Sequence, residues 1–371
     1  MKEAERPVQR RISVCHKDKL RMAALAVLLV AVFLGSFFWG RYDISVLQLL
    51  AMLMEGLQRA LTALVNLAGK LFGFYIDRLF AVPVLWTPVM ESVVLHIRLP
   101  RILMACLVGC CLSAAGASYQ GVFQNPMASP DLLGASTGAC FGAALAILHG
   151  GSSAVITLSA FCFSLLTVLL VFLIGQNAPG KKVINLILAG IMVSSLFSAG
   201  TSYIKLVADP ASQLPEITYW LMGSLSGTRL IGVTLWFAIF PMALGLIPLL
   251  CIRWRINLLT LGEEEARAMG VNTARIRLVV ILCATLITAA SVSVSGMIGW
   301  VGLVIPHLCR RFIGNDYRML LPASMLFGAA FLLTVDNISR NLLAVEIPIG
   351  ILTAFIGAPF FIYLMNREGG V

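Results

Sequence analysis

One short segment of the chain approaches a nucleotide-binding motif. Residues 175–181 read Gly-Gln-Asn-Ala-Pro-Gly-Lys, which is close to the phosphate-binding loop of ATPases. That motif needs a serine or threonine hydroxyl for Mg²⁺ at the next position, where this chain has Lys182, and it needs a preceding β-strand. The segment instead lies between two apolar runs. We therefore predict a short turn here, and we expect ATP and Mg²⁺ to bind to a separate subunit if ATP drives this protein.

The cysteine and histidine residues do not form a metal-binding or catalytic pattern. Most of the nine cysteines lie inside apolar runs, where cysteine behaves as a small hydrophobic side chain, and no CxxC pair occurs. His307 is isolated in sequence, and the chain has no HExxH motif and no Ser/His/Asp or paired-carboxylate arrangement. We predict no catalytic residue, no metal site, no cofactor bound by this chain, and a protein that is not an enzyme.

Residues 253–276 form a polar segment with helical features. Glu263, Glu264 and Glu265 favour a helix N-terminus because of the helix dipole, and Gly270 can end that helix. A second short helix can follow from Asn272. Such a compact pair of helices in the cytoplasm can fit a cleft on a motor subunit and transmit its movement. From these residues alone, a solvated loop is an equally good interpretation.

These polar segments interrupt a sequence with the composition of a membrane protein. The 371 residues are 59% hydrophobic and 12% charged, and the mean hydropathy is +0.94. Soluble domains carry about 25% charged residues. Apolar runs of about 18 residues are long enough to cross the bilayer as helices. We predict an all-α, polytopic membrane helical bundle with about ten transmembrane helices. The predicted spans lie near residues 22–40, 102–120, 133–149, 154–174, 184–206, 231–252, 277–295, 300–313, 320–341 and 348–366.

The basic residues predict which side of the membrane each loop faces. With the N-terminus in the cytoplasm, about two thirds of the 27 lysines and arginines fall in cytoplasmic segments, as the positive-inside rule requires. Ten spans return the C-terminus to the cytoplasm. The same rule explains the net charge of +10 without nucleic acid as a partner. The chain thus divides into a cytoplasmic basic tail, residues 1–21, and a transmembrane domain, residues 22–371, in the cell membrane.

The long outer segment at residues 41–96 is semi-apolar and is interrupted by charged residues. Leucines and one valine recur in it at roughly helical spacing, which is typical of an amphipathic helix lying at the membrane interface. These apolar residues are Val46, Leu49, Leu50, Leu53, Leu57, Leu61 and Leu64. A hidden pair of spans would also preserve the predicted topology. We favour the interfacial helix because charges interrupt every window that could cross the membrane.

Five stretches, in order along residues 95–368, resemble the signatures of permeases in the FecCD family. These permeases are the membrane subunits of importers for iron-siderophores, haem and cobalamin. The stretches are Ile97-Arg-Leu-Pro-Arg101, Asn125–Ala139, Leu261–Val271, Gly299–His307 and Glu346–Pro359. The long outer segment before His96 exceeds the usual family pattern.

The resemblance implies the architecture of an ATP-binding cassette (ABC) importer. We expect a homodimer in the membrane, or a dimer with a closely related permease, with ten spans in each subunit. Two ATP-binding cassette subunits would dock on the cytoplasmic side, and a substrate-binding protein would dock on the periplasmic or extracellular side. The expected function is to move an iron-siderophore, haem or cobalamin-type chelate from that binding protein into the cytoplasm.

The resemblance also assigns roles to particular residues. The residues expected to couple this chain to the ATPase are Leu261, Gly262, Glu263, Ala266, Met269, Gly270 and Val271. The arginines expected to pair with glutamates of the binding protein are Arg98 and Arg101, with Arg340 as a third candidate. The alternative for these arginines is anchoring at the membrane interface by snorkelling.

The loop after the second span supplies a candidate inner gate. Its residues are Asn125, Pro126 and Pro130. A turn whose prolines end the helices is an equally good interpretation. Asp131 lies just before the next helix, where it is expected to act as a structural cap.

An ion-coupled secondary transporter is the main alternative function. Such transporters usually carry ionisable residues at the middle of the membrane. Here the ionisable residues of the spans lie near span ends, which favours the ATP-driven importer. These residues are Asp131, Lys205, Asp336 and Glu346.

Overall fold

The computed structural model describes residues 5–40, 42, 44–72, 75–80, 86–179, 182–227, 233–260, 262–270 and 272–368. Helices dominate this part of the chain, and it contains no β-strand. The helices are α1 (Glu5–Phe38), α2 (Val46–Phe72), α3 (Pro88–Ser92), η1 (Val93–Arg98), α4 (Leu99–Val122), η2 (Pro130–Leu133), α5 (Ala135–Leu148), α6 (Ser153–Asn177), α7 (Lys182–Val207), α8 (Gln213–Leu221), α9 (Val233–Thr260), α10 (Glu263–Ala268), α11 (Thr273–Ser295), α12 (Val301–Ile313), α13 (Tyr317–Asn341) and α14 (Ile349–Glu368).

Every predicted span coincides with a helix of the structure. Among the described residues, seven helical segments are long and apolar enough to cross a membrane, and α5 and α14 contribute two shorter apolar helices. The helix at the short eighth run, α12, has 13 residues and contains Pro306. The all-α membrane bundle is therefore confirmed, whereas the number of ten spans and the cytoplasmic position of both termini stay predictions.

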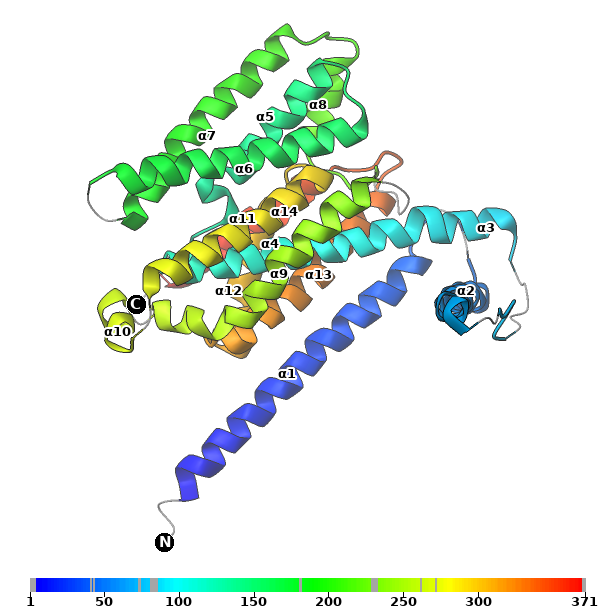
Figure 1. The fold of residues 1–371 in the computed structure, drawn as a ribbon, viewed down its shortest axis with the longest axis horizontal. Coiled ribbons are helices and arrows are strands. Elements are labelled where there is room, and N and C mark those ends of the chain that lie inside the picture. Colours follow the sequence, from blue (N-terminus) through cyan, green and yellow to red (C-terminus); the bar gives the residue numbers. More distant parts are fainter. Residues whose placement is uncertain are drawn as a thin grey trace.

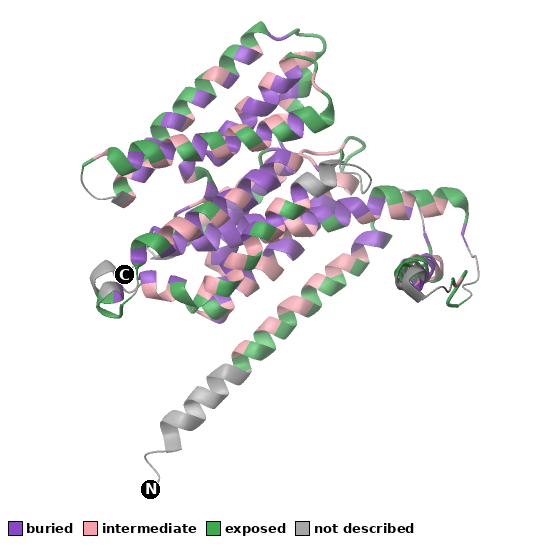
Figure 2. Cartoon of the chain, viewed as in Figure 1, coloured by how far each residue is buried: buried purple, intermediate pink, exposed green. Residues whose placement is uncertain are grey.

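Two groups of helices pack against each other (Figure 1). The central group contains α4, α9, α11, α12, α13 and α14, and α4 packs against α13, α11, α12 and α9. The second group contains α5, α6, α7 and the short α8, and α5 and α6 join it to α11. Helix α1 lies along α13 at one edge. Buried residues concentrate on α4, α11 and α13, so these helices form the core (Figure 2).

Small residues allow the core helices to approach closely. A Cβ atom added to Gly116 of α4 would lie 1.8 Å from the carbonyl oxygen of Gly302 in α12, which is far inside van der Waals contact. Likewise, a Cβ atom on Gly138 of α5 would lie 2.6 Å from the carbonyl oxygen of Phe163 in α6. Lipid gives helices no hydrophobic reason to associate, so close backbone packing of this kind stabilises membrane bundles.

Helix α2 runs across the other helices at the end of the bundle opposite α10, where Figure 1 shows it nearly end-on. One face of it buries Leu49, Met52 and Gln58, while apolar residues such as Leu57 and Leu64 are exposed. The segment whose apolar residues recur at helical spacing thus forms a single helix over residues 46–72. The position of this helix at the membrane interface stays a prediction.

An ion pair joins α2 to α3. Arg59 Nη1 lies 2.7 Å from Glu91 Oε1, and Arg59 Nε lies 3.0 Å from Glu55 Oε1. These hydrogen bonds, first to Glu91 and then to Glu55, raise the pKa of Arg59, so its guanidinium stays charged. The ion pair holds α2 beside the N-terminal extension of α4, because α3, η1 and α4 form one continuous helical segment from Pro88 to Val122.

Candidate functional site

The predicted coupling segment forms a short helix between two long ones. Helix α9 ends at Thr260, α10 occupies Glu263–Ala268, and Asn272 caps α11 by accepting a hydrogen bond from the backbone N–H of Arg275 at 3.0 Å. The polar segment therefore contains one short helix. The prediction of a second short helix is wrong, because the helix that starts after Asn272 continues without a break into the predicted seventh span.

Two glycines shape the turns on either side of α10. Gly262 has a φ of +122° and Gly270 has a φ of +75°, and both values lie in the region that side-chain-bearing residues rarely adopt. A Cβ atom on Gly270 would meet no atom within 4 Å, so this position needs glycine for its backbone conformation only. The two turns project α10 from the end of the bundle, as Figure 1 shows.

The two faces of α10 differ in exposure. Ala266 is fully buried, whereas Met269, just after the helix, is 52% exposed. This arrangement anchors the helix through Ala266 and leaves Met269 on the exposed side. Leu261 and Val271 of the predicted coupling set lie outside the described residues, and nothing is described of the side chain of Glu263.

A polar network next to α10 joins the ends of four core helices. Arg310 of α12 donates a hydrogen bond to Gln120 of α4 and another, at 3.1 Å, to the hydroxyl of Tyr317 in α13. Asn257 of α9 accepts a hydrogen bond from the backbone N–H of Tyr317 at 2.8 Å and donates one to Asp316 at 2.6 Å. The network therefore ties α9, which leads into α10, to the other core helices.

Sequence reasoning missed this network. Its members come from four separate helices, and only the basic residue in the last turn of α12, Arg310, carries a local signal. Gln120 and Tyr317 have no such signal, because each becomes a partner only after the helices pack.

At the opposite end of the bundle, Arg101 lies in a cluster of charged residues. Its Nε lies 2.9 Å from Asp336 Oδ1, and its Nη1 lies 2.9 Å from Glu346 Oε1. Arg340 Nε is 3.2 Å from Asp336 Oδ2. Arg101 is 6% exposed and Asp336 is fully buried. The cluster connects α4 to α13 and to the loop that precedes α14.

Arg98 is also occupied within the chain. It donates hydrogen bonds to the backbone carbonyl of Phe37 and, at 2.6 Å, to that of Tyr42, and it is 4% exposed. The sequence leads us to expect Arg98 and Arg101 as surface charges at the start of the second span. The structure buries both inside the chain because the helical segment continues outward to Pro88 and α1 packs nearby. Their docking role, and that of Arg340, stays a prediction without support from this geometry.

The candidate gate loop is built as a turn. Asn125 Oδ1 accepts a hydrogen bond from the backbone N–H of Met127 at 2.9 Å, and its backbone carbonyl accepts one from Ala128 at 3.0 Å. Asn125 and Pro126 are exposed, whereas Pro130 is buried at the start of η2 and packs near Gly302. Both predicted interpretations, gate and helix-ending turn, are compatible with these positions.

The next residue in this loop, Asp131, accepts a hydrogen bond from the hydroxyl of Ser136 in the first turn of α5. The acid thus ties η2 to the helix that follows, consistent with the structural role expected for it.

In the part of the chain that the structure describes, histidine, cysteine, aspartate and glutamate form no group of three that could hold a metal ion. His307 lies within α12. The expectation that this chain binds no metal or other cofactor therefore rests on the sequence alone.

Comparisons with known proteins extend these observations. The model of the FecCD transport family matches residues 27–367. The chain is 42% identical over 285 residues to the molybdate import system permease protein MolB of Haemophilus influenzae, covering 76% of this chain and 84% of that protein. It is 40% identical over 280 residues to the cobalamin import system permease protein BtuC of Halobacterium salinarum, covering 75% and 74% of the two chains.

A solved structure is similar over nearly the whole chain. It is an inward-facing conformation of an ABC transporter described as of the metal-chelate type. The two chains superpose with a TM-score of 0.78 at 38% sequence identity, and the match covers 93% of this chain and 98% of the other.

Proposed function

This chain belongs to the FecCD transport family, and we propose that, as the permease subunit of an ABC importer, it moves an iron-siderophore, haem or cobalamin-type chelate into the cytoplasm. The observation that carries the choice of cargo is the similarity to the metal-chelate-type transporter, at a TM-score of 0.78 and 38% identity over 93% of the chain. The relative named for cobalamin import supports the same class of cargo.

A second cargo has a specific observation in its favour. The relative that is 42% identical to this chain is named for molybdate import, and molybdate is an oxyanion rather than a chelate. A molybdate importer would need the same fold and the same coupling machinery. The two cargoes are therefore distinguished by what the partner binding protein captures.

The proposed assembly places two permease subunits side by side, as a homodimer or with a closely related permease. Two ATP-binding cassette subunits dock at the α10 end and bind the ATP and Mg²⁺, and a substrate-binding protein docks at the opposite end. Support comes from the projecting helix α10, with buried Ala266 and exposed Met269, and from the family membership.

Within this assembly, we assign coupling to the whole predicted set from Leu261 to Val271. The exposed Met269 would contact the ATP-binding subunit, while the turns at Gly262 and Gly270 set the direction of α10. The polar network around Arg310 would pass the movement of α9 and α10 to the core helices. The loop with Asn125, Pro126 and Pro130 would form part of the inner gate.

At the outer end, the geometry favours an indirect role for the predicted docking arginines. Arg101 and Arg340 share Asp336, and Arg101 also holds Glu346 in the loop before α14. They would therefore keep that loop in place beneath the binding protein. Direct pairing with the binding protein would require these internal ion pairs to open.

The test is transport by the reconstituted complex. The chain is reconstituted in liposomes with the ATP-binding subunit and binding protein of its own gene neighbourhood, and uptake of labelled cobalamin, ferric siderophore, haem and molybdate is followed. We expect uptake of one of these that requires ATP and persists when proton and sodium gradients are collapsed. Uptake driven by an ion gradient without ATP would overturn the proposal, and the ligand that copurifies with the binding protein identifies the cargo.

A further inference from the structure

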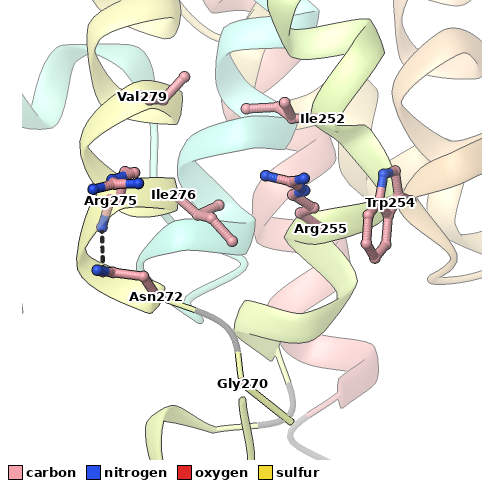
Figure 3. A pocket seen from close by; sticks show the side chains of 8 residues that line it. All are labelled: Ile252, Trp254, Arg255, Gly270, Asn272, Arg275, Ile276 and Val279. Carbon is pink, nitrogen blue, oxygen red and sulfur yellow. Dashed lines mark hydrogen bonds between the residues drawn. The ribbon is translucent and has the colours of Figure 1, made fainter. Parts of the chain in front are cut away.

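A pocket of about 350 Å³ lies between the ends of α9 and α11 that flank α10. Figure 3 shows its lining, with side chains from α9 on one wall and from α11 on the other. The lining residues are Ile252, Trp254, Arg255, Gly270, Asn272, Arg275, Ile276 and Val279. Of these lining residues, only Gly270 has a role predicted from the sequence, as a member of the coupling set. The pocket itself has no predicted role.

The pocket is polar at one end and apolar at the other. Helix α9 runs toward α10 and α11 runs away from it, so Arg255 and Arg275 lie near the α10 end. Ile252 lies one helical turn deeper on α9, and Val279 lies one turn deeper on α11. The basic groups therefore sit at the aqueous end, and the apolar groups extend toward the interior of the membrane.

The basic end is short of anionic partners. Among the described residues, neither Arg255 nor Arg275 forms an ion pair, and no acidic residue lines the pocket. Arg255 lies over the ring of Trp254, with its Cζ 5.3 Å from the ring centroid. Asn272 uses its Oδ1 to cap α11, which leaves its amide group available as a donor. Two guanidinium groups and an amide donor together suit a phosphate group.

The pocket continues an exposed apolar stripe of α9. Phe240, Leu244, Ile247 and Trp254 recur on one face of α9 and are 63%, 53%, 61% and 44% exposed. Tryptophan at the end of such a stripe is typical of the membrane–water interface. On α11, Leu282 is 58% exposed and lies seven residues, two helical turns, from the exposed Arg275. An acyl chain can therefore follow these stripes while its headgroup lies in the pocket.

We propose that the pocket between α9 and α11 binds an anionic phospholipid of the inner leaflet. The phosphate lies between Arg255 and Arg275, and an acyl chain packs along Ile252, Ile276 and Val279. Basic pockets between transmembrane helices on the cytoplasmic side are suited to anionic lipid headgroups. Because α9 and α11 are the two helices that hold α10, the bound lipid would brace the base of the coupling helix. The binding itself does not depend on the proposed transport function.

The experiment measures lipid retention by the purified full-length protein. The protein is delipidated, incubated with phosphatidylglycerol or phosphatidylcholine in detergent, and analysed by native mass spectrometry. We expect one phosphatidylglycerol to be retained preferentially per chain. The double variant R255Q/R275Q should lose about tenfold or more of this preference, since each basic residue contributes about 1 kcal/mol to an anionic lipid.

A matched variant and two further ligands make the result specific. R21Q/R318Q removes two exposed arginines that do not line the pocket and should keep the preference. Glycerol phosphate, which lacks acyl chains, should fail to compete with phosphatidylglycerol. Lipid with brominated acyl chains should quench the part of the tryptophan fluorescence that comes from Trp254, and the variant W254F should lack this quenched part.

Three outcomes would overturn the proposal. Equal loss of lipid in both double variants would show that the effect is one of net charge. Full competition by glycerol phosphate would assign the pocket to a free phosphate compound. Unchanged lipid retention by R255Q/R275Q together with weakened binding of the ATP-binding subunit would assign the pocket to that subunit. Thermal unfolding in detergent, measured for each variant, separates these outcomes from loss of folding.

Discussion

At the scale of single residues, the cluster of charges at the end of the core opposite α10 is expected to contribute to stability. Arg101 and Arg340 both contact Asp336, which is fully buried. A buried charge without a partner is far more costly than a buried pair, because the pair's attraction offsets much of the lost hydration. Each member of the cluster is therefore needed by the others. The same reasoning explains why Arg101 is tolerated near the start of α4 and Arg340 near the end of α13.

Asp336→Asn is expected to destabilise the fold. The change leaves the buried Arg101 and the partly buried Arg340 with less negative charge beside them, and we expect the free energy of unfolding to fall by about 3 kcal/mol. Chemical unfolding in detergent, followed by circular dichroism, measures this. The matched control is Asp77→Asn, an exposed acid in the stretch between α2 and α3, which should change little. Equal stability of the two variants would contradict the assignment of Asp336 as the anchor of the cluster.

At the scale of elements, backbone proximity sets how the helices fit together. Gly116 and Gly302 bring α4 and α12 into contact, and the added Cβ distance of 1.8 Å shows that no larger residue fits at Gly116 without movement. Helix α10, in contrast, is attached by two turns that need glycine for their conformation. The core is therefore rigid by packing, and the coupling helix is positioned by its turns.

Gly116→Ala is expected to loosen the contact between α4 and α12. Although alanine favours helix, its Cβ would force the helices apart, and we expect a loss of about 2 kcal/mol in unfolding free energy. The matched control is Gly35→Ala in α1, where a Cβ meets no atom within 4 Å and the higher helix propensity of alanine should be neutral or stabilising. A stabilised Gly116→Ala variant would contradict the close contact.

Ala266→Phe is expected to separate ATP hydrolysis from transport. Ala266 is fully buried, so a phenylalanine there must displace α10 from its seat against the bundle. In reconstituted complexes we expect the amount of cargo transported per ATP hydrolysed to fall about tenfold while the permease stays folded. A tenfold change lies within the usual range of coupling free energies between two sites. Parallel uptake and phosphate-release assays measure this ratio. The same substitution at exposed Ala211, in the loop before α8, is the control and should transport normally.

At the scale of the whole molecule, the two ends of the bundle carry different structural features. The α10 end carries helix α10, the Arg310 network and the pocket between α9 and α11, and the opposite end carries the ion-pair cluster and the crosswise helix α2. Under the proposed function, the first end would receive the movement of the ATP-binding subunits and the second would meet the binding protein. This division requires the α10 end to face the cytoplasm.

Reporter fusions test that orientation. Alkaline phosphatase, which is active only outside the cytoplasm, is fused after Gly150 in the loop between α5 and α6 or after the last residue. We expect activity for the fusion at Gly150 and none at the C-terminus, where a fluorescent protein should fold and fluoresce instead. The opposite pattern would reverse the proposed assignment of the two ends, and activity at both sites would change the predicted number of spans.

The sequence by itself determined the class of the protein and the positions of its helices. Each apolar run is a local property whose length is matched to the bilayer, so all ten runs coincide with helices without knowledge of their neighbours. The periodicity of residues 46–64 similarly placed α2, and the Leu261–Val271 stretch indicated the family. Gly270 was also recognisable as the end of a helix, because its conformation depends on the local chain.

Only the tertiary structure decided which residues act together. Arg101 meets Asp336 across 235 positions of sequence, so its ion pair exists only when α4 and α13 pack. That packing buried Arg101, which the sequence had led us to expect at the surface. The packing of α4, α12 and α13 likewise joined Gln120, Arg310 and Tyr317. The packing of α9 against α11 brought Arg255 and Arg275, which precede and follow α10 in sequence, to one pocket. Span positions follow from local apolarity and bilayer thickness, whereas partners follow from the close approach of helices far apart in the chain.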